Sequence, residues 1–176
     1  VSIGYTVPFI PTEEKWWRLR DVPLVKPMII AFCVTYLTLA FPIFEQTAMA
    51  EVFEPFNQQL FLERFAFLLA VTIPFEMRDQ ETDAKAGMNT LATKFGFLVS
   101  KRVAISATIT WFVLIVLRLF ILEQMVAILP FLLVFILLLL AIKKLNPTRG
   151  EFYYVLCFEG MILIYSSSII LAQTLA

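Results

Sequence analysis

Three carboxylates, Glu76, Asp79 and Asp83, come directly after an apolar stretch that is long enough to enter a lipid bilayer. If one helix continues through this segment, steps of about 100° per residue bring the three side chains within roughly 60° of one another. Three negative charges on one face repel each other unless a cation binds there. Carboxylate oxygens on neighbouring turns suit Mg²⁺, which proteins usually hold through one or two carboxylates together with phosphate oxygens of a substrate. The spacing therefore predicts a magnesium site at the end of a membrane helix.

Cations accompany the acids in the same segment. Arg78 lies among the acids, and Lys85 and Lys94 follow them. Between these lysines, Gly87 can end a helix and Asn89-Thr90 can form a turn or a cap. Acids that bind a metal and cations that bind phosphate together predict a diphosphate site. The alternative is a solvated loop, because acidic residues just outside a membrane helix often bind nothing.

Two further candidate phosphate ligands precede the first apolar stretch. The segment before that stretch mixes Pro, Trp and basic residues, and Arg20 and Lys26 lie nearest to its membrane end. Cations in this position can bind a diphosphate. They can equally act as interfacial anchors, because Trp16, Trp17 and the stems of basic side chains favour the headgroup region.

The acidic segment resembles the second aspartate-rich motif of the UbiA superfamily of intramembrane prenyltransferases, which reads close to D-I-R-D-x-x-x-D-x-x-x-G-x-x-T-L-x-x-x-x-G. The positions that agree with this pattern are Arg78, Asp79, Asp83, Gly87, Thr90, Leu91 and Gly96. Glu76 departs from it, because the family usually has Asp at that position. The charge is kept, but the side chain reaches one methylene further.

The resemblance implies a bundle of about nine membrane helices, of which residues 1–176 would be the C-terminal part. It implies that Asp79 and Asp83 are catalytic metal ligands, that Glu76 is a third ligand and that Mg²⁺ is the cofactor. Family members move a prenyl group from a polyprenyl diphosphate to an aromatic or other lipophilic acceptor. Their first aspartate-rich motif, N-D-x-x-D-like, has no counterpart in this sequence, so we expect the chain alone to lack transferase activity.

Composition indicates a membrane protein. Hydrophobic residues make up 60% of the sequence and charged residues 16%, there is no His, and the mean hydropathy is +0.85. These values lie outside the range of soluble globular domains. We predict an all-α polytopic membrane protein with about five transmembrane helices, each near the roughly 20 residues that a spanning helix needs. The expected ranges are 28–48, 60–76, 103–122, 126–142 and 152–175.

The distribution of Lys and Arg predicts how these helices are oriented. Twelve of the 14 cations lie in segments on one side of the predicted membrane. The opposite loop, about 45–59, contains Glu45, Glu51 and Glu54 but no cation. Under the positive-inside rule the basic side is cytoplasmic. We therefore expect the acidic motif to face the cytoplasm, which contains Mg²⁺ and phosphorylated metabolites.

Glu159 lies well inside the last apolar stretch. An ionisable group there costs roughly 2.5–3.5 kcal/mol on insertion scales, so it should face the bundle interior or a water-filled cavity. Two roles are open for it: lining the pocket of the lipophilic acceptor, or hydrogen bonding to Tyr165 or to the serines at 166–168. Arg118, near a predicted helix end, is expected to extend toward the interface.

Other functions fit the sequence less well. CDP-alcohol phosphatidyltransferases also place acids at the ends of membrane helices, but their D-x-x-D-G-x-x-A-R pattern does not occur here. A non-catalytic homologue or structural subunit would keep the helices without the chemistry, and Glu76 and the lack of a first motif favour it. Membrane lipid is an expected partner. Nucleic acid is not, because the basic residues flank membrane helices and form no stripe with aromatic residues.

Overall fold

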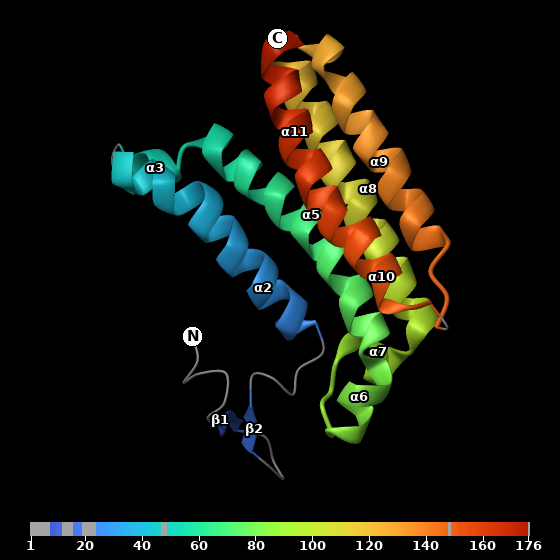
Figure 1. Ribbon diagram of the computed structural model, residues 1–176. Helices are drawn as coiled ribbons and strands as arrows, with labels where there is room; N and C mark the ends of the chain where they lie inside the picture. Colours follow the sequence, from blue (N-terminus) through green and yellow to red (C-terminus); the bar gives the residue numbers. More distant parts are fainter. Residues whose placement is uncertain (1–7, 12–15, 19–23, 47–48, 148, 176) are drawn as a thin grey trace.

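The computed structural model describes residues 8–11, 16–18, 24–46, 49–147 and 149–175, and long helices dominate it (Figure 1). In this part of the chain, four helices are long and apolar enough to cross a membrane. They run over Val25–Glu45, Phe97–Ile121, Met125–Lys143 and Glu151–Leu175. The prediction of an all-α polytopic membrane protein is therefore confirmed.

Three of the four apolar helices contain a change of helix type. The elements of the first are α2 (Val25–Thr35), the π-helix η2 (Tyr36–Ala40) and α3 (Phe41–Gln46). The second is α8 (Phe97–Ile121), and the third joins the 3₁₀-helix η3 (Met125–Ala127) to α9 (Ile128–Lys143). The fourth consists of α10 (Glu151–Tyr154), the π-helix η4 (Val155–Glu159) and α11 (Gly160–Leu175).

The remaining long helix, α5 (Pro55–Arg78), contains the predicted span 60–76. It has 24 residues, which is long enough for a span, but it is not among the four apolar helices. The physical reason is its charge, because Glu63, Arg64 and Glu76 all lie within the predicted range. It packs against α2 and α8, and its two acids, Glu63 and Glu76, are both buried.

Short elements make up the rest of the described chain. The first two are the antiparallel strands β1 (Pro8–Pro11) and β2 (Trp16–Arg18), which lie in the segment before the first membrane helix. The others are the helices α4 (Met49–Val52), α6 (Gln80–Lys85) and α7 (Leu91–Phe95). The stretch 45–59, predicted as a loop, is therefore largely helical in its described part.

Small residues allow α5 and α8 to pack closely together. Ala66 and Ala70 on α5 and Ala104 and Ala107 on α8 are all buried. Without bulky side chains between them, two membrane helices can bring their backbones together, and dispersion forces then stabilise the contact. Aromatic rings fill the space beside this contact, in a cluster formed by Phe67, Trp111, Phe131 and Tyr165.

Arg118 pairs with an acid of another helix, a contact that was not predicted. Its Nε lies 2.8 Å from Oε1 of Glu63 on α5, so the two side chains form an ion pair. Glu63 is only 1% exposed. A buried carboxylate needs a charged partner, and the packing of α5 against α8 supplies one.

The two ends of the bundle differ in what they carry. At one end α2 begins, α5 ends in α6 and α7, and α10 begins (Figure 1). We call this end, which contains Lys26, Asp79 and Glu151, the motif end. The C-terminal residues of α11 and the start of α5 lie toward the other end, which we call the opposite end.

Candidate functional site

The helix that carries the acidic motif breaks at Asp79. α5 ends at Arg78 and α6 begins at Gln80, with Asp79 between them at φ −85° and ψ 5°. The Asp79 N–H still donates to the Phe75 carbonyl, at 3.0 Å. The single continuous helix on which the common carboxylate face depends is therefore not formed, and that geometric expectation is wrong.

Glu76 and Asp83 turn toward the interior of the bundle on either side of the break. Both are only 3% exposed. Lys26, one residue into α2, places its Nζ 3.6 Å from Oδ2 of Asp83. The positive charge of Lys26 also stabilises the ionised form of Glu76, whereas the negative charge of Asp83 destabilises it. The two buried acids thus share the neighbourhood of one lysine.

Asp79 points elsewhere and is paired with its neighbour. Arg78 donates from Nε to Oδ1 at 2.7 Å and from Nη2 to Oδ2 at 3.1 Å, which is a two-pronged pairing. The Arg78 guanidinium also lies over the rings of Phe75 and Tyr154, at 5.2 and 5.9 Å from their centroids. The Asp79 side chain is 37% exposed, so this acid is accessible while the other two are not.

The three acids do not form one cluster. Within the described residues, no group of three or more His, Cys, Asp or Glu side chains is arranged to hold a metal ion. The pairing of Asp79 with Arg78 explains this, because it holds one carboxylate outside the bundle interior. The expected three-ligand arrangement of Glu76, Asp79 and Asp83 is therefore reduced to two buried acids and one surface acid.

The two buried acids nevertheless have unused oxygen atoms. Within the described chain, Oε1 and Oε2 of Glu76 and Oδ2 of Asp83 accept no hydrogen bond of good geometry. The backbone N–H of Leu91 lies near the Glu76 carboxylate and interacts with it favourably, but it does not meet the distance and angle of a hydrogen bond. Buried carboxylate oxygens are normally paired, because leaving them unpaired is costly. These oxygens fit the donor set that Mg²⁺ takes, namely one or two carboxylates with the remaining ligands from water or phosphate.

The glycines and the threonine of the motif shape the backbone around the acids. Gly87 ends α6 with φ 67°, and Gly96 joins α7 to α8 with φ 81°, conformations that favour glycine. Thr90 caps α7, because its Oγ1 accepts from the Thr93 N–H at 3.3 Å while Oγ1 of Thr93 accepts from the Thr90 N–H at 2.8 Å. The predicted helix end at Gly87 and the predicted cap at Thr90 are both confirmed.

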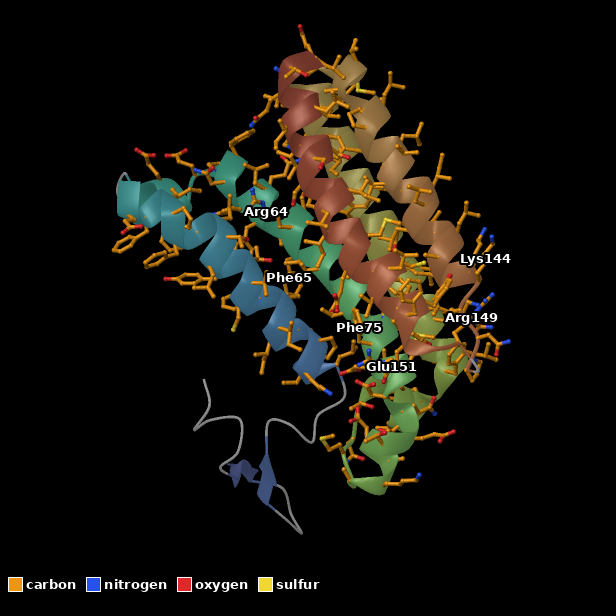
Figure 2. The ribbon with its side chains drawn as sticks, viewed as in Figure 1. Arg64, Phe65, Phe75, Lys144, Arg149 and Glu151 are labelled. Atoms are coloured by element: carbon orange, nitrogen blue, oxygen red, sulfur yellow. The ribbon has the colours of Figure 1, made fainter. Side chains whose placement is uncertain are left out.

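Most of the predicted site residues line one cavity at the motif end. It has a volume of about 330 Å³ and lies between α2, α5 and η4. Its lining residues are Lys26, Pro27, Ile30, Thr72, Phe75, Glu76, Arg78, Asp79 and Glu159. Phe75 and the nearby Glu151 mark this end of the bundle in Figure 2.

Other predicted residues lie outside that cavity. Lys85 and Lys94 are exposed on α6 and α7, and neither lines it. Asp83 lies behind the lining, within reach of Lys26. Arg20 is outside the described residues.

Glu159 reaches the cavity from the last membrane helix. Of the two roles left open for it, lining a pocket agrees with its position. The serines do not bond to it in the structure, because Ser166, Ser167 and Ser168 donate to backbone carbonyls four residues earlier. Sequence reasoning missed Thr72 and Phe75, although Thr72 lies one turn before Glu76 and is a polar residue inside an apolar stretch.

A second cavity lies one to two turns further along the same helices, away from the motif end. It has a volume of about 280 Å³, with Val34 from α2 and Thr38 from η2 on one side and Arg64 and Leu68 from α5 on another. Ile162 and Ile169 of α11 complete its mainly apolar lining. The two cavities together follow the line along which α2, α5 and the last membrane helix run.

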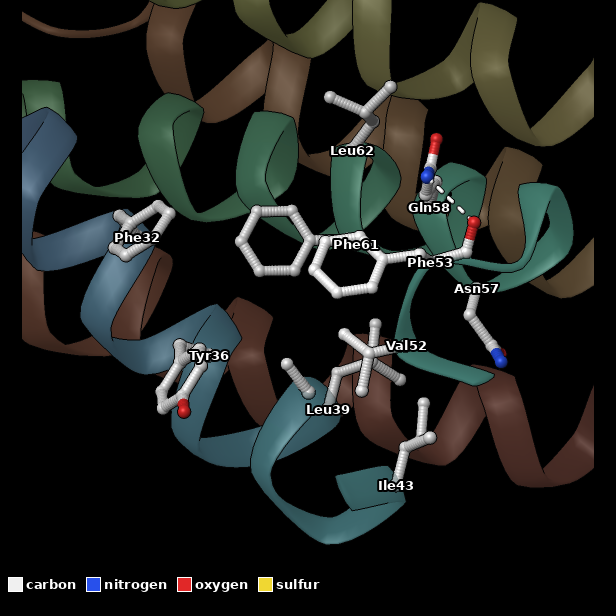
Figure 3. A pocket seen from close by; sticks show the side chains of 11 residues that line it. Phe32, Tyr36, Leu39, Ile43, Val52, Phe53, Asn57, Gln58, Phe61 and Leu62 are labelled. Carbon is white, nitrogen blue, oxygen red and sulfur yellow. Dashed lines mark hydrogen bonds between the residues drawn. The ribbon is translucent and has the colours of Figure 1, made fainter. Parts of the chain in front are cut away.

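A further apolar cavity, shown in Figure 3, has no acid in its lining. It has a volume of about 430 Å³ and lies between the first membrane helix and the beginning of α5. Phe32, Phe53 and Phe61 are among its lining side chains, and Asn57 and Gln58 are its amides. It carries no ionisable group except the phenol of Tyr36, so it offers space for apolar groups but no acid–base or metal chemistry.

Comparisons of the chain with models of protein families, with curated proteins and with solved structures found no match. The site itself offers two buried acids, a lysine beside them, and two separate cavities that follow one another along the same helices.

Proposed function

We propose that this chain is the C-terminal part of a Mg²⁺-dependent intramembrane prenyltransferase of the UbiA superfamily, which moves a prenyl group from a polyprenyl diphosphate to a lipophilic acceptor. The observation that carries the proposal is the set of buried oxygens on Glu76 and Asp83 that accept no hydrogen bond within the described chain, beside Lys26. Such a set costs free energy in a protein without a ligand. A bound cation and a phosphate would satisfy both the oxygens and the lysine.

The residues present can divide the work of binding a diphosphate. Glu76 and Asp83 would hold Mg²⁺, which when bound neutralises charge on the departing diphosphate. Lys26 is placed to donate to a phosphate oxygen as well as to Asp83. Arg78 presents a planar fork that now engages Asp79 and that binds phosphate oxygens equally well. Transfer breaks the bond between the allylic carbon and the diphosphate oxygen, the electron pair leaves on the diphosphate, and the acceptor forms the new bond and loses a proton.

The two successive cavities support the choice of substrate. A prenyl diphosphate has a charged head and a long apolar tail. The cavity of about 330 Å³ carries Lys26, Arg78 and three acids, and the cavity of about 280 Å³ beyond it is mainly apolar, with Arg64 as the one charged residue in its lining. Head and tail would therefore each meet groups of matching polarity. Glu159, at the wall of the first cavity, would be available to the acceptor.

A transfer assay tests the proposal directly. We expect the chain alone to transfer no label from a radiolabelled prenyl diphosphate with Mg²⁺, because it carries one acidic motif where the resembled family uses two. Co-expression with a segment that carries a first aspartate-rich motif should produce transfer that EDTA abolishes. Activity of the chain alone would contradict the need for a second cluster. Inactivity of both forms would favour the alternative of a non-catalytic membrane homologue.

Orientation in the membrane is part of the same proposal. We expect residues 76–102 and 143–151 to face the cytoplasm and residues 45–59 to face the other side, because the cations gather at the motif end. Single cysteines at positions 80 and 57, in a chain without Cys33 and Cys157, should show this by labelling of intact cells with an impermeant reagent. Position 57 should be labelled and position 80 protected. The reverse pattern would place the acids away from cytoplasmic Mg²⁺ and contradict the proposal.

A further inference from the structure

A polar cavity lies toward the opposite end of the bundle, remote from the acidic motif. It has a volume of about 250 Å³ and is enclosed by α5, α8, α9 and α11. Its polar lining residues are Glu63, Arg64, Arg118, Gln124, Tyr165 and Gln173. Arg64, Tyr165 and Ile169 also line the cavity of about 280 Å³. The proposed transferase chemistry assigns no role to the charged groups of the polar cavity, so those groups require their own explanation.

Arg118 commits only part of its guanidinium to Glu63. Its Nε donates to both carboxylate oxygens, at 2.8 and 3.1 Å. Within the described chain, its two terminal nitrogens, Nη1 and Nη2, donate no hydrogen bond. Neither of these two nitrogens is among the fully buried atoms that lack a partner. These nitrogens are therefore accessible to something in the cavity. A guanidinium has five N–H donors in a planar fork, and most of them remain for a second acceptor.

Arg64 adds a second cation to the same cavity. It donates from Nη1 to the Thr38 carbonyl at 2.8 Å, and that bond leaves its charge without a carboxylate partner of its own. Figure 2 shows Arg64 on α5, well separated from Glu151 at the motif end. Among the lining residues there are two guanidinium groups and one carboxylate, which Arg118 already engages. One positive charge is thus uncompensated in a partly enclosed space.

The remaining walls are apolar. Phe56 and Leu60 from α5 and Phe131 from α9 line the cavity, together with Ile169. Gln124 and the exposed Gln173 lie near helix ends, where a membrane helix meets the headgroup region. The cavity therefore combines an excess of positive charge with an apolar wall, which is the complement of an amphiphile with an anionic head.

We propose that this cavity binds an oxyanion, a phosphate group with one or two negative charges, through Arg64 and Arg118, and that an anionic phospholipid supplies it. The inference does not depend on the proposed transferase function. Charge-assisted hydrogen bonds from a guanidinium fork to phosphate oxygens are among the strongest that a protein forms. The apolar walls would contact the first carbons of the lipid chains.

Binding measurements on the purified chain test the proposal. Native mass spectrometry would compare phosphatidylglycerol, phosphatidylcholine with the same acyl chains, and inorganic phosphate. We expect phosphatidylglycerol to bind more tightly than phosphatidylcholine. Arg64→Gln should weaken that binding about tenfold, because one charge-assisted contact is lost while the Glu63–Arg118 pair is kept. Arg102→Gln is the matched control, because it makes the same substitution at an arginine of the motif end. This variant should bind phosphatidylglycerol as tightly as the unchanged chain does.

Two further arms decide between lipid and free phosphate and guard against misfolding. Gln173→Glu adds a negative charge at the exposed edge of the cavity and should also weaken phosphatidylglycerol binding without disturbing the core. Saturation by inorganic phosphate that depends on Arg64, without preference for the lipid, would identify a free oxyanion as the ligand. Equal binding by Arg64→Gln, Gln173→Glu and Arg102→Gln chains would overturn the proposal and leave Glu63–Arg118 as a structural ion pair.

Discussion

Asp83→Asn is expected to reduce the proposed prenyl transfer of the co-expressed chain by about 10- to 100-fold or more, by analogy with other metal sites. Asp83 is buried and lies 3.6 Å from Lys26, so the substitution removes both a metal oxygen and the partner of the lysine. Asparagine keeps the size of the side chain, and membrane insertion should be unchanged. Turnover from a labelled prenyl diphosphate at saturating Mg²⁺ measures the effect.

Three companion variants make this result interpretable. Glu76→Gln should lose as much activity as Asp83→Asn, because the two acids are buried side by side around Lys26; the sequence alone ranked Glu76 below Asp79 and Asp83. Asp79→Asn should also reduce transfer, since it removes the carboxylate that holds the Arg78 guanidinium in place. Glu81→Gln, an exposed acid on α6, is the control and should be fully active. Near-normal turnover in the Asp83 variant would exclude its role at the diphosphate.

Arg118→Met is expected to destabilise the folded chain by about 3–5 kcal/mol, because it leaves the Glu63 carboxylate buried without its cation. The carboxylate is 1% exposed, and both of its oxygens accept from Arg118 Nε. Equilibrium unfolding in a lipid–detergent mixture measures the free energy. The expected result is a lower midpoint of denaturation with an unchanged slope.

The double variant Glu63→Leu with Arg118→Met provides the control for this prediction. Removing both charges together leaves no unpaired group, so its stability should return close to that of the unchanged chain, or exceed it. The coupling between the two sites would then account for most of the loss in the single variant. Equal destabilisation by the single and double variants would show that packing, and not the ion pair, is what Arg118 contributes to the contact between α5 and α8.

Local features of the sequence were sufficient for much of the architecture. Mean hydropathy and the lengths of the apolar stretches predicted the membrane class and four of the helices, because the length that a bilayer requires is a property of consecutive residues. Gly87 and Thr90 were recognised as a helix end and a cap for the same reason, since positive φ and side-chain capping depend on a few neighbouring residues. The span predicted at 60–76 disregarded the charges that the sequence shows there, and α5 is not among the four apolar helices.

Contacts between distant residues required the tertiary structure. Nothing local indicates that Arg118 meets Glu63, 55 residues away, or that Lys26 meets Asp83, because the packing of helices against one another determines which side chains face each other. The break at Asp79 is similar: its neighbours permit a continuous helix, yet α5 ends there, and Asp79 pairs with Arg78 while Glu76 and Asp83 enter the bundle. The sequence by itself thus determined which residue types could do chemistry and roughly where they lie along the helices. Only the three-dimensional packing decided which of them share a cavity, because burial and charge pairing are properties of the assembled bundle and not of any single segment.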